Sequence, residues 1–414
     1  MKKPINFSLL PLLLFIWSCN NDNLDEKQTK ATVTDHVPAK GTYAYDANFF
    51  KKNATGIIEL QNEEGNAKVL LSAGYQGRVM TSTSSGDTGT SYGWINYDLI
   101  ASGEKKKQFN PVGGEERFWM GPEGGQYSIF FKPNDSFSIA HWQVPPVIDT
   151  VAFDIKESGS TRAVFTKNTS FSNYSGTRFD IAIERSISLL GKKTVEEKLM
   201  LPLPSSVRMV AYETLNSIKN TGATDWKKKN GLLSIWLLGM LTPSPTTTVI
   251  IPFHPQDNAR SLITDNYFGK IPPERLMVKD SVLYFTCDGR YRSKIGIAPA
   301  IAKLVAASYD FTHDVLNIVL LQVDRNGMYV NSKWEMQREP YKGDVVNSYN
   351  DGPLQDGSQL GPFYEIESSS PARELKRGEK QEYRQITCHL QGNYTDLKEI
   401  ARKLVGVDLD EIKK

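Results

Sequence analysis

Short runs of alternating polar and apolar residues recur along most of the chain from about residue 56 onward. They are rich in β-branched and aromatic residues, and Gly, Asn, Asp, Ser or Pro separates one run from the next, as is typical of strands. Because alternation places the apolar residues on one face, the pattern predicts antiparallel sheets with one buried side. The clearest runs are residues 56–60, 67–72, 127–131, 161–167, 179–190, 207–215, 247–253, 281–286, 315–323 and 382–390.

One run is apolar throughout instead of alternating. Residues 232–240 (LLSIWLLGM) contain no charged side chain, which predicts a strand buried on both faces. The same composition places Trp236 in the core without a polar partner. The run is too short to cross a bilayer, which takes about 20 apolar residues.

Helical spacing appears clearly only near the C-terminus. Apolar residues at positions 397, 400, 401 and 404 share one helical face, with Thr395 as a candidate N-cap and Gly406 as the stop. The chain shows no internal repeat, no GxGxxG motif or P-loop, and no Pro-rich linker. The sequence therefore predicts an all-β fold over residues 46–414: one large antiparallel β-sandwich with a short C-terminal helix.

The N-terminus carries export features. Lys2 and Lys3 precede the apolar residues 7–17, a run too short for a membrane span, so residues 1–18 are predicted to be a signal peptide. The sequence up to Cys19 resembles the lipobox of bacterial lipoproteins, in which the cysteine after the cleavage site is lipidated. Residues 19–45 would then form a flexible tether. A conventional secretory signal with an incidental cysteine is the alternative.

These features imply attachment to a bacterial envelope through Cys19, as an outer-membrane lipoprotein whose domain faces either the periplasm or the cell surface. The 414 residues include 39% hydrophobic and 23% charged residues, with a formal net charge of +2. Such a composition fits a soluble core and gives no reason to expect a nucleic-acid partner. The oligomeric state is left open.

The other two cysteines, Cys287 and Cys388, lie in no CxxC motif and in no His-rich cluster. A zinc site is therefore not expected, and the sequence offers no motif for another metal or a cofactor. The two cysteines could pair in an oxidising compartment, but we favour two buried free thiols.

Polar residues that a core would not accommodate gather in three regions, at residues 75–125, 285–296 and 341–390. The densest stretch is residues 113–125 (GGEERFWMGPEGG), in which glycines alternate with charged and aromatic side chains. A tight hairpin whose tryptophan caps the core is one interpretation of this stretch. A ligand-binding loop is the other.

Three segments resemble the galactose mutarotase (aldose 1-epimerase) superfamily, and in particular its lipoprotein branch of unassigned function. They are residues 74–86 (GYQGRVMTSTSSG), the glycine-rich stretch above, and a late strand that continues into residues 375–379 (LKRGE). The likeness spans about residues 57–391. It implies a supersandwich of two large antiparallel sheets, a sugar-binding groove on one face, and a catalytic glutamate on the late strand.

The late strand fits this resemblance. Glu365 and Glu367 are two residues apart, so both side chains point to one side of an extended strand. Neighbouring carboxylates repel and burial disfavours their charge, which is how a general acid or base is tuned. The spacing to Pro371 favours Glu367 as the superfamily's glutamate. The alternative is a structural network in which both carboxylates accept hydrogen bonds from Arg117, Arg292 or Lys294.

Sugar recognition needs aromatic platforms for ring faces and planar polar groups for hydroxyls. Trp119 could stack on a ring, while Arg117 and Glu123 could clamp hydroxyls. The superfamily's acid histidine has no clear counterpart here, and His141 is the best substitute as proton donor. The full set of candidate substrate-binding residues is Arg78, Trp94, Asn96, Glu115, Arg117, Trp119, Glu123, Arg292 and Asn347.

Two functions follow as hypotheses. In the first, the protein is an aldose-epimerase-like enzyme, in which Glu367 removes the anomeric hydroxyl proton and an acid such as His141 protonates the ring oxygen. In the second, it is a non-catalytic glycan-binding lipoprotein that keeps the sugar groove. A glycosidase is less favoured, because Glu365 and Glu367 share one strand face and would not flank a scissile bond.

Overall fold

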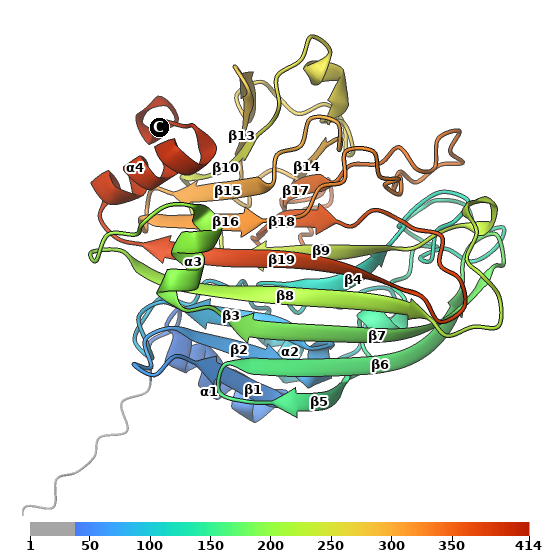
Figure 1. Ribbon diagram of the computed structural model, residues 1–414, viewed down its shortest axis with the longest axis horizontal. Coiled ribbons are helices and arrows are strands. Elements are labelled where there is room, and N and C mark those ends of the chain that lie inside the picture. Colours follow the sequence, from blue (N-terminus) through green and yellow to red (C-terminus); the bar gives the residue numbers. More distant parts are fainter. Residues whose placement is uncertain (1–37, 414) are drawn as a thin grey trace, which may run out of the picture. The chain divides into compact units, whose positions relative to one another are not determined.

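Three antiparallel sheets form the body of the protein in the computed structural model, which describes residues 38–413. The largest has ten strands, whose long members run side by side in Figure 1. In spatial order they are β12 (Leu276–Lys279), β13 (Val282–Thr286), β10 (Thr247–Pro252), β15 (Val305–Asp310), β16 (Val315–Leu320), β19 (Lys380–Gln391), β8 (Arg208–Asn220), β7 (Arg178–Leu189), β6 (Arg162–Ser172) and β5 (Asp154–Ser158).

A six-stranded sheet and a three-stranded sheet complete the set. The six-stranded sheet runs in the order β11 (Ile263–Thr264), β14 (Ser293–Ile297), β17 (Val346–Asn350), β18 (Tyr364–Ser369), β9 (Ser234–Leu241) and β4 (Arg117–Gly121). The three-stranded sheet consists of β1 (Ile57–Gln61), β2 (Lys68–Ser72) and β3 (Arg78–Thr83).

Polar side chains tie the ten-stranded sheet to the six-stranded sheet. Arg185 of β7 donates to a carboxylate oxygen of Glu116 at 2.8 Å, just before β4 begins. Gln385 of β19 donates to the other oxygen of Glu116 at 2.8 Å and accepts from Ser368 of β18 at 2.6 Å. Apolar residues from both sheets fill the space around these bonds. The expected all-β sandwich is therefore confirmed, and β9 is buried along its whole length as predicted.

The predicted C-terminal helix is present as α4 (Tyr394–Val405). Its stop at Gly406 is confirmed, since this residue has a left-handed φ of 75°. Its N-cap is Asn393 and not Thr395, because the Asn393 side chain accepts from the backbone N–H of Asp396 at 3.0 Å. The buried face of α4 packs on the side of the ten-stranded sheet away from the six-stranded sheet.

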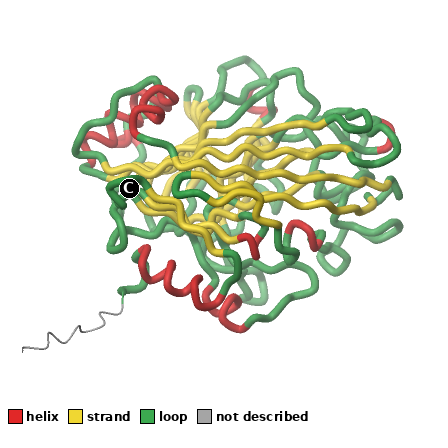
Figure 2. Tube along the Cα trace, turned by 60° about the horizontal axis from the view of Figure 1, so that its bottom comes forward, coloured by secondary structure: helices red, strands yellow, loops and turns green. Residues whose placement is uncertain are grey.

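Three further helices were not expected: α1 (Tyr43–Asn53), α2 (Tyr97–Ser102) and α3 (Lys192–Leu199). Helix α1 buries Tyr43, Ala47 and Phe50 in a cluster with residues of β2 and β3. Its apolar and aromatic residues do not gather on one face, which explains why periodicity alone missed it. In Figure 2 the helices lie at the margins of the strands.

Residues 127–131 do not form the predicted strand. The backbone N–H of Ser128 bonds to the carbonyl of Gly125, and its hydroxyl donates to the carbonyl of Glu123. Local turns thus take the bonds that a sheet would need. Phe130 and Phe131 are buried in the core all the same, so the apolar residues of this segment reflect core packing and not a strand.

Cys287 and Cys388 are free and buried, which confirms the two predicted thiols.

The proposed signal peptide, Cys19 and most of the proposed tether lie outside the described residues. Within residues 38–413, no helix is long and apolar enough to cross a membrane.

The edge strand β5 is exposed at every position, and its pairing with β6 shifts register between Ile155 and Glu157.

We expect Arg185→Met to lower the free energy of unfolding by about 3–5 kcal/mol, because it leaves the fully buried Glu116 carboxylate without its cation. Urea unfolding monitored by circular dichroism measures the change. Arg162→Met, which breaks an ion pair that is about half exposed, is the matched control and should cost at most about 1 kcal/mol. Equal losses in the two variants would contradict the role given to Arg185.

Candidate functional site

One face of the six-stranded sheet carries an unusual set of polar side chains. Leu238 of β9 lies directly opposite Arg117 of β4 on one side and Glu367 of β18 on the other. Asn347 of β17 lies opposite Glu367 in turn. Directly opposed residues share a face, so strands distant in sequence place these side chains together. The other face of the same strands is mainly apolar, with polar residues such as Ser368, and faces the core between the sheets.

Glu365 and Arg117 form a buried ion pair on this face. Nη2 of Arg117 donates to Oε1 of Glu365. Burial raises the pKa of Glu365, which Arg117 opposes and the neighbouring Glu367 reinforces. Arg117 uses one donor in this pair. Its Nε and Nη1 are buried and have no hydrogen-bond partner among the described residues.

Glu367 is the most deeply buried carboxylate of the cluster, with a side chain that is 0% exposed. Its Oε2 accepts two hydrogen bonds, from Nζ of Lys294 at 2.9 Å and from Nε1 of Trp236 at 2.9 Å. Its Oε1 has no hydrogen-bond partner within residues 38–413. One oxygen is thus fixed by two donors, while the other keeps its full capacity to accept a proton.

Lys294 supplies the positive charge next to Glu367. Its ammonium group lies 5.0 Å from the ring centre of Trp236 and 5.7 Å from that of Tyr267. Burial lowers the pKa of Lys294, but the charges of Glu367 and Glu123 outweigh burial and raise the pKa above its usual value. Lys294 therefore stays protonated at neutral pH.

Glu123 is the third carboxyl group of this cluster. It follows the end of β4 and is partly buried. Burial raises its pKa to about 7; Lys294 lowers the value and Glu367 raises it further. The nearby side chains of Trp142 and Trp334 also lower the pKa of Glu123. Near neutral pH this carboxyl group exists in both protonation states.

Aromatic rings surround the charged groups. Trp119 and Trp236 meet edge to face with ring centres 5.5 Å apart, and the guanidinium of Arg117 lies 4.5 Å from the ring centre of Trp119. Trp142 and Trp334 stack at 5.9 Å. The arrangement combines charged groups, which bind the hydroxyls of a sugar, with flat apolar surfaces, which bind its ring faces. We call the set Arg117, Trp119, Glu123, Trp236, Lys294, Glu365 and Glu367 the carboxylate cluster.

Several predicted site residues lie away from this cluster. Arg78 is fully buried and donates to the carbonyl of Gly113 at 2.8 Å. Glu115 accepts from Ser82 at 2.7 Å and lies 2.6 Å from the imidazole of His389, between the sheets. Asn96 caps helix α2 by accepting from the backbone N–H of Leu99. Each of these side chains has a structural partner.

His141 lies at an exposed turn, where Nδ1 of its ring is 2.9 Å from the hydroxyl of Ser136. Its hydrogen bonds stay within residues 136–141. No hydrogen bond or ion pair joins it to the carboxylate cluster in the described part of the chain. The adjacent residue, Trp142, is the one that lies beside Glu123.

The remaining three predicted residues lie next to the cluster. Asn347 donates to the hydroxyl of Tyr267 at 3.3 Å. Trp94 packs on Phe363 with ring centres 4.9 Å apart. The guanidinium of Arg292 lies 3.7 Å from the ring centre of Phe268, a side chain that is 46% exposed.

The sequence analysis was wrong about Trp236, which has a polar partner in Glu367. It named Lys294 only as a structural partner of the glutamates, and it missed Tyr267, Trp142 and Trp334. Lys294 lies two residues before Gly296 on the short strand β14, and Gly296 is paired with Asn347. Strand alternation could therefore have placed Lys294 on the same sheet face as Asn347. Trp142 and Trp334 come from loops, where no periodic signal exists.

The glycines at the start of residues 113–125 serve packing within the protein. Gly113 and Gly114 have φ values of 95° and 110°, which other residues rarely adopt. A Cβ on Gly113 would lie 2.0 Å from the carbonyl oxygen of Trp94, and one on Gly114 would lie 2.5 Å from Cδ of Arg78. These glycines therefore allow other parts of the protein, and not a ligand, to pack closely against the backbone.

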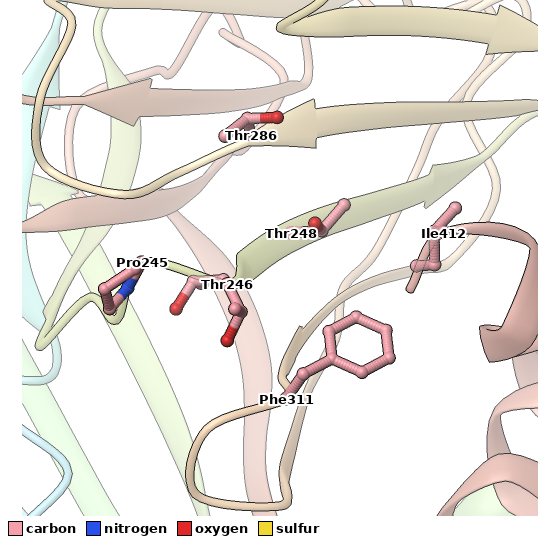
Figure 3. Close-up of a pocket in the computed structure, with 7 residues that line it drawn as sticks. Pro245, Thr246, Thr248, Thr286, Phe311 and Ile412 are labelled. Atoms are coloured by element: carbon pink, nitrogen blue, oxygen red, sulfur yellow. The ribbon is translucent and has the colours of Figure 1, made fainter. Parts of the chain in front are cut away.

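A separate depression lies at the end of β10, far from the sheet face just described, and is shown in Figure 3. It is lined by Phe311, Ile412 and residues 245–248, none of which is charged. It offers neither acid nor base, so we do not assign chemistry to it. No group of His, Cys, Asp or Glu side chains suited to holding a metal ion occurs in residues 38–413.

Solved structures share the fold at low identity. The Slr1438 protein from Synechocystis sp. PCC 6803 matches with a TM-score of 0.50 and 11% identity, over 81% of this chain and 96% of that chain. A galactose mutarotase related enzyme from Lactobacillus acidophilus gives 0.46 and 10%, over 82% and 98%. A galactose mutarotase-like protein from Lactobacillus casei ATCC 334 gives 0.45 and 10%, over 81% and 100%.

The antiparallel β-sandwich expected from the sequence is thus confirmed, and at such identities the likeness concerns the fold alone. No curated protein matches the chain. Residues 41–414 match the family described as "Family of unknown function (DUF6786)", and since this is most of its length, the chain belongs to that family.

Proposed function

We propose that the protein binds a sugar at the carboxylate cluster and interconverts its anomers in the manner of an aldose 1-epimerase. The observation that carries this proposal is the state of Glu367. One carboxylate oxygen is fixed by Lys294 and Trp236, while Oε1 is buried without a partner. An unpaired buried oxygen costs free energy, so a ligand that donates a proton or a hydrogen bond to it is favoured.

The reaction needs only proton transfers. Glu367 takes the proton of the anomeric hydroxyl, the bond between the anomeric carbon and the ring oxygen breaks, and an acid protonates the ring oxygen. Rotation about the adjacent carbon–carbon bond and reclosure return both protons and give the other anomer. Lys294 provides the counter-charge of the buried Glu367 carboxylate, which acts as the base.

Recognition is assigned to Arg117 and the tryptophans. Nε and Nη1 of Arg117 are buried donors without partners, so sugar hydroxyls would satisfy them. The ring face of Trp119 is already occupied by the guanidinium of Arg117. Trp142 and Trp334 are only partly buried, so their rings are the more accessible ones for a sugar to stack on. Because Glu367 is fully buried, a sugar reaches Oε1 only when a covering side chain moves.

The second candidate is a protein that binds the sugar without catalysing the reaction. It is supported by the ion pairs of Glu365 and Glu367, which are also what a purely structural network would contain. Two-dimensional exchange NMR on α-D-glucose and α-D-galactose separates the two functions. Faster exchange with protein supports the enzyme. Binding in calorimetry without faster exchange supports a glycan-binding protein.

We further propose attachment to a bacterial outer membrane through a lipid on Cys19, as the resemblance of residues 16–19 to a lipobox favours. These residues lie outside the described part of the chain. Metabolic labelling with an alkyne fatty acid should mark the protein and should fail with Cys19→Ser. Equal labelling of both forms would overturn the anchor.

We expect Glu367→Gln to reduce anomer exchange about 10²–10⁴-fold, because glutamine fills the same volume but cannot act as a general base. Glu197→Gln, at an exposed position of α3, is the control and should leave the rate unchanged. Exchange NMR at equal protein concentration measures both variants, and circular dichroism verifies their folding. An active Glu367→Gln protein would contradict the assignment.

Lys294→Met should destabilise the protein by about 3–5 kcal/mol at neutral pH, because the buried Glu367 carboxylate loses its cation. Urea unfolding monitored by circular dichroism measures this loss, with Lys156→Met at an exposed ion pair as control. Equal losses in the two variants would show that the charge of Lys294 is not needed to keep Glu367 buried.

A further inference from the structure

We propose that Glu123 is the acid that protonates the sugar ring oxygen, as the partner of the base Glu367. This inference rests on the proposed function, since it assigns the second proton carrier of the same reaction. The sequence placed Glu123 among the sugar-binding residues and sought the acid at His141.

The first argument is position. Glu123 follows β4 directly, and β4 carries Arg117 and Trp119 on the face that Glu367 shares. The charges of both Glu123 and Glu367 raise the pKa of Lys294, so both carboxyl groups lie near its ammonium. A sugar bound to Oε1 of Glu367 would therefore lie within reach of a second carboxyl group.

The second argument is how Glu123 is held. Its backbone N–H donates to the hydroxyl of Ser332 at 3.4 Å, and its carbonyl accepts from Ser128. Gly124 packs so closely on the backbone of Lys333 that a Cβ there would lie 2.3 Å from the carbonyl oxygen. The loop of residues 331–337 is thus fixed against the Glu123 backbone. Of the three carboxyl groups, Glu123 alone is partly exposed.

The third argument is charge. Before the reaction Glu367 is ionised, Lys294 is protonated and Glu123 carries a proton, so the three groups sum to zero. In the ring-opened state Glu367 holds the hydroxyl proton and Glu123 has lost its own, so the sum is again zero. A buried site strongly resists a change of net charge, and here the negative charge only moves from one neighbour of Lys294 to the other.

The other acids in reach fit less well. Burial raises the pKa of Glu365 to about 7 as well, but Arg117 already donates a hydrogen bond to Oε1 of Glu365 and holds this carboxyl group in an ion pair. Lys294 has a raised pKa and gives up its proton reluctantly. His141 makes its hydrogen bonds within its own exposed turn. The pKa of about 7 places Glu123 where a general acid is most effective at neutral pH.

The test compares wild type, Glu123→Gln, His141→Ala and the exposed control Glu197→Gln by exchange NMR on α-D-glucose and α-D-galactose between pH 5 and 9. In wild type we expect the rate to fall as the pH rises through about 7, because Glu123 loses its proton there. Glu123→Gln should lower the rate by at least about 10²-fold and remove this fall. His141→Ala and Glu197→Gln should behave as wild type.

Difference infrared spectra provide a readout independent of turnover. Wild type minus Glu123→Gln should show a protonated carboxyl band at pH 5.5 that disappears by pH 9, and a folded Glu123→Gln protein should still bind the sugar in calorimetry. Full activity of Glu123→Gln, or an ionised Glu123 at pH 5.5, would overturn the inference and leave the proposed function standing. If wild type accelerates exchange of neither sugar, the proposed reaction and this assignment fall together.

Discussion

The contact between Lys294 and Glu367 is the interaction on which the site depends. A carboxylate with no solvent exposure is costly to bury unless a cation and hydrogen bonds accompany it. Lys294 and Trp236 both bind the same oxygen, so the charge is compensated while the second oxygen is left unsatisfied. This unsatisfied oxygen is the feature on which the proposed function rests.

The two sheets divide the polar residues between them. Glu115 and Glu116 point into the interior of the sandwich, where His389 and Arg185 meet them. Arg117, the next residue, belongs to the strand face that carries the carboxylate cluster. Three consecutive charged residues therefore join two separate networks, one holding the sheets together and one forming the candidate site. The rigidity of the first fixes the position of the second.

Strand alternation predicted the fold class and the common face of Glu365 and Glu367, because a strand places side chains two residues apart on one side. The apolar run of residues 232–240 predicted the buried β9, and glycine-rich surroundings brought Arg117 and Glu123 to attention. The sequence could not identify the partner of Glu115, because His389 lies on a strand more than 270 positions away and their contact follows from the order of the strands in the sheets. Arg78 and Asn96 resembled site residues until their hydrogen bonds to the backbone of Gly113 and Leu99 were seen. The loop tryptophans had no pattern to reveal them.

The strand β5 has a consequence for how these molecules meet one another. It closes one side of the largest sheet, and its backbone there would offer ready hydrogen bonds to any passing strand. All five of its residues are exposed, charges of both signs alternate along it, and a register shift interrupts its pairing with β6. An incoming chain would have to desolvate those charges and follow an irregular edge. Copies crowded together can thus collide along this border without fusing into a continuous sheet.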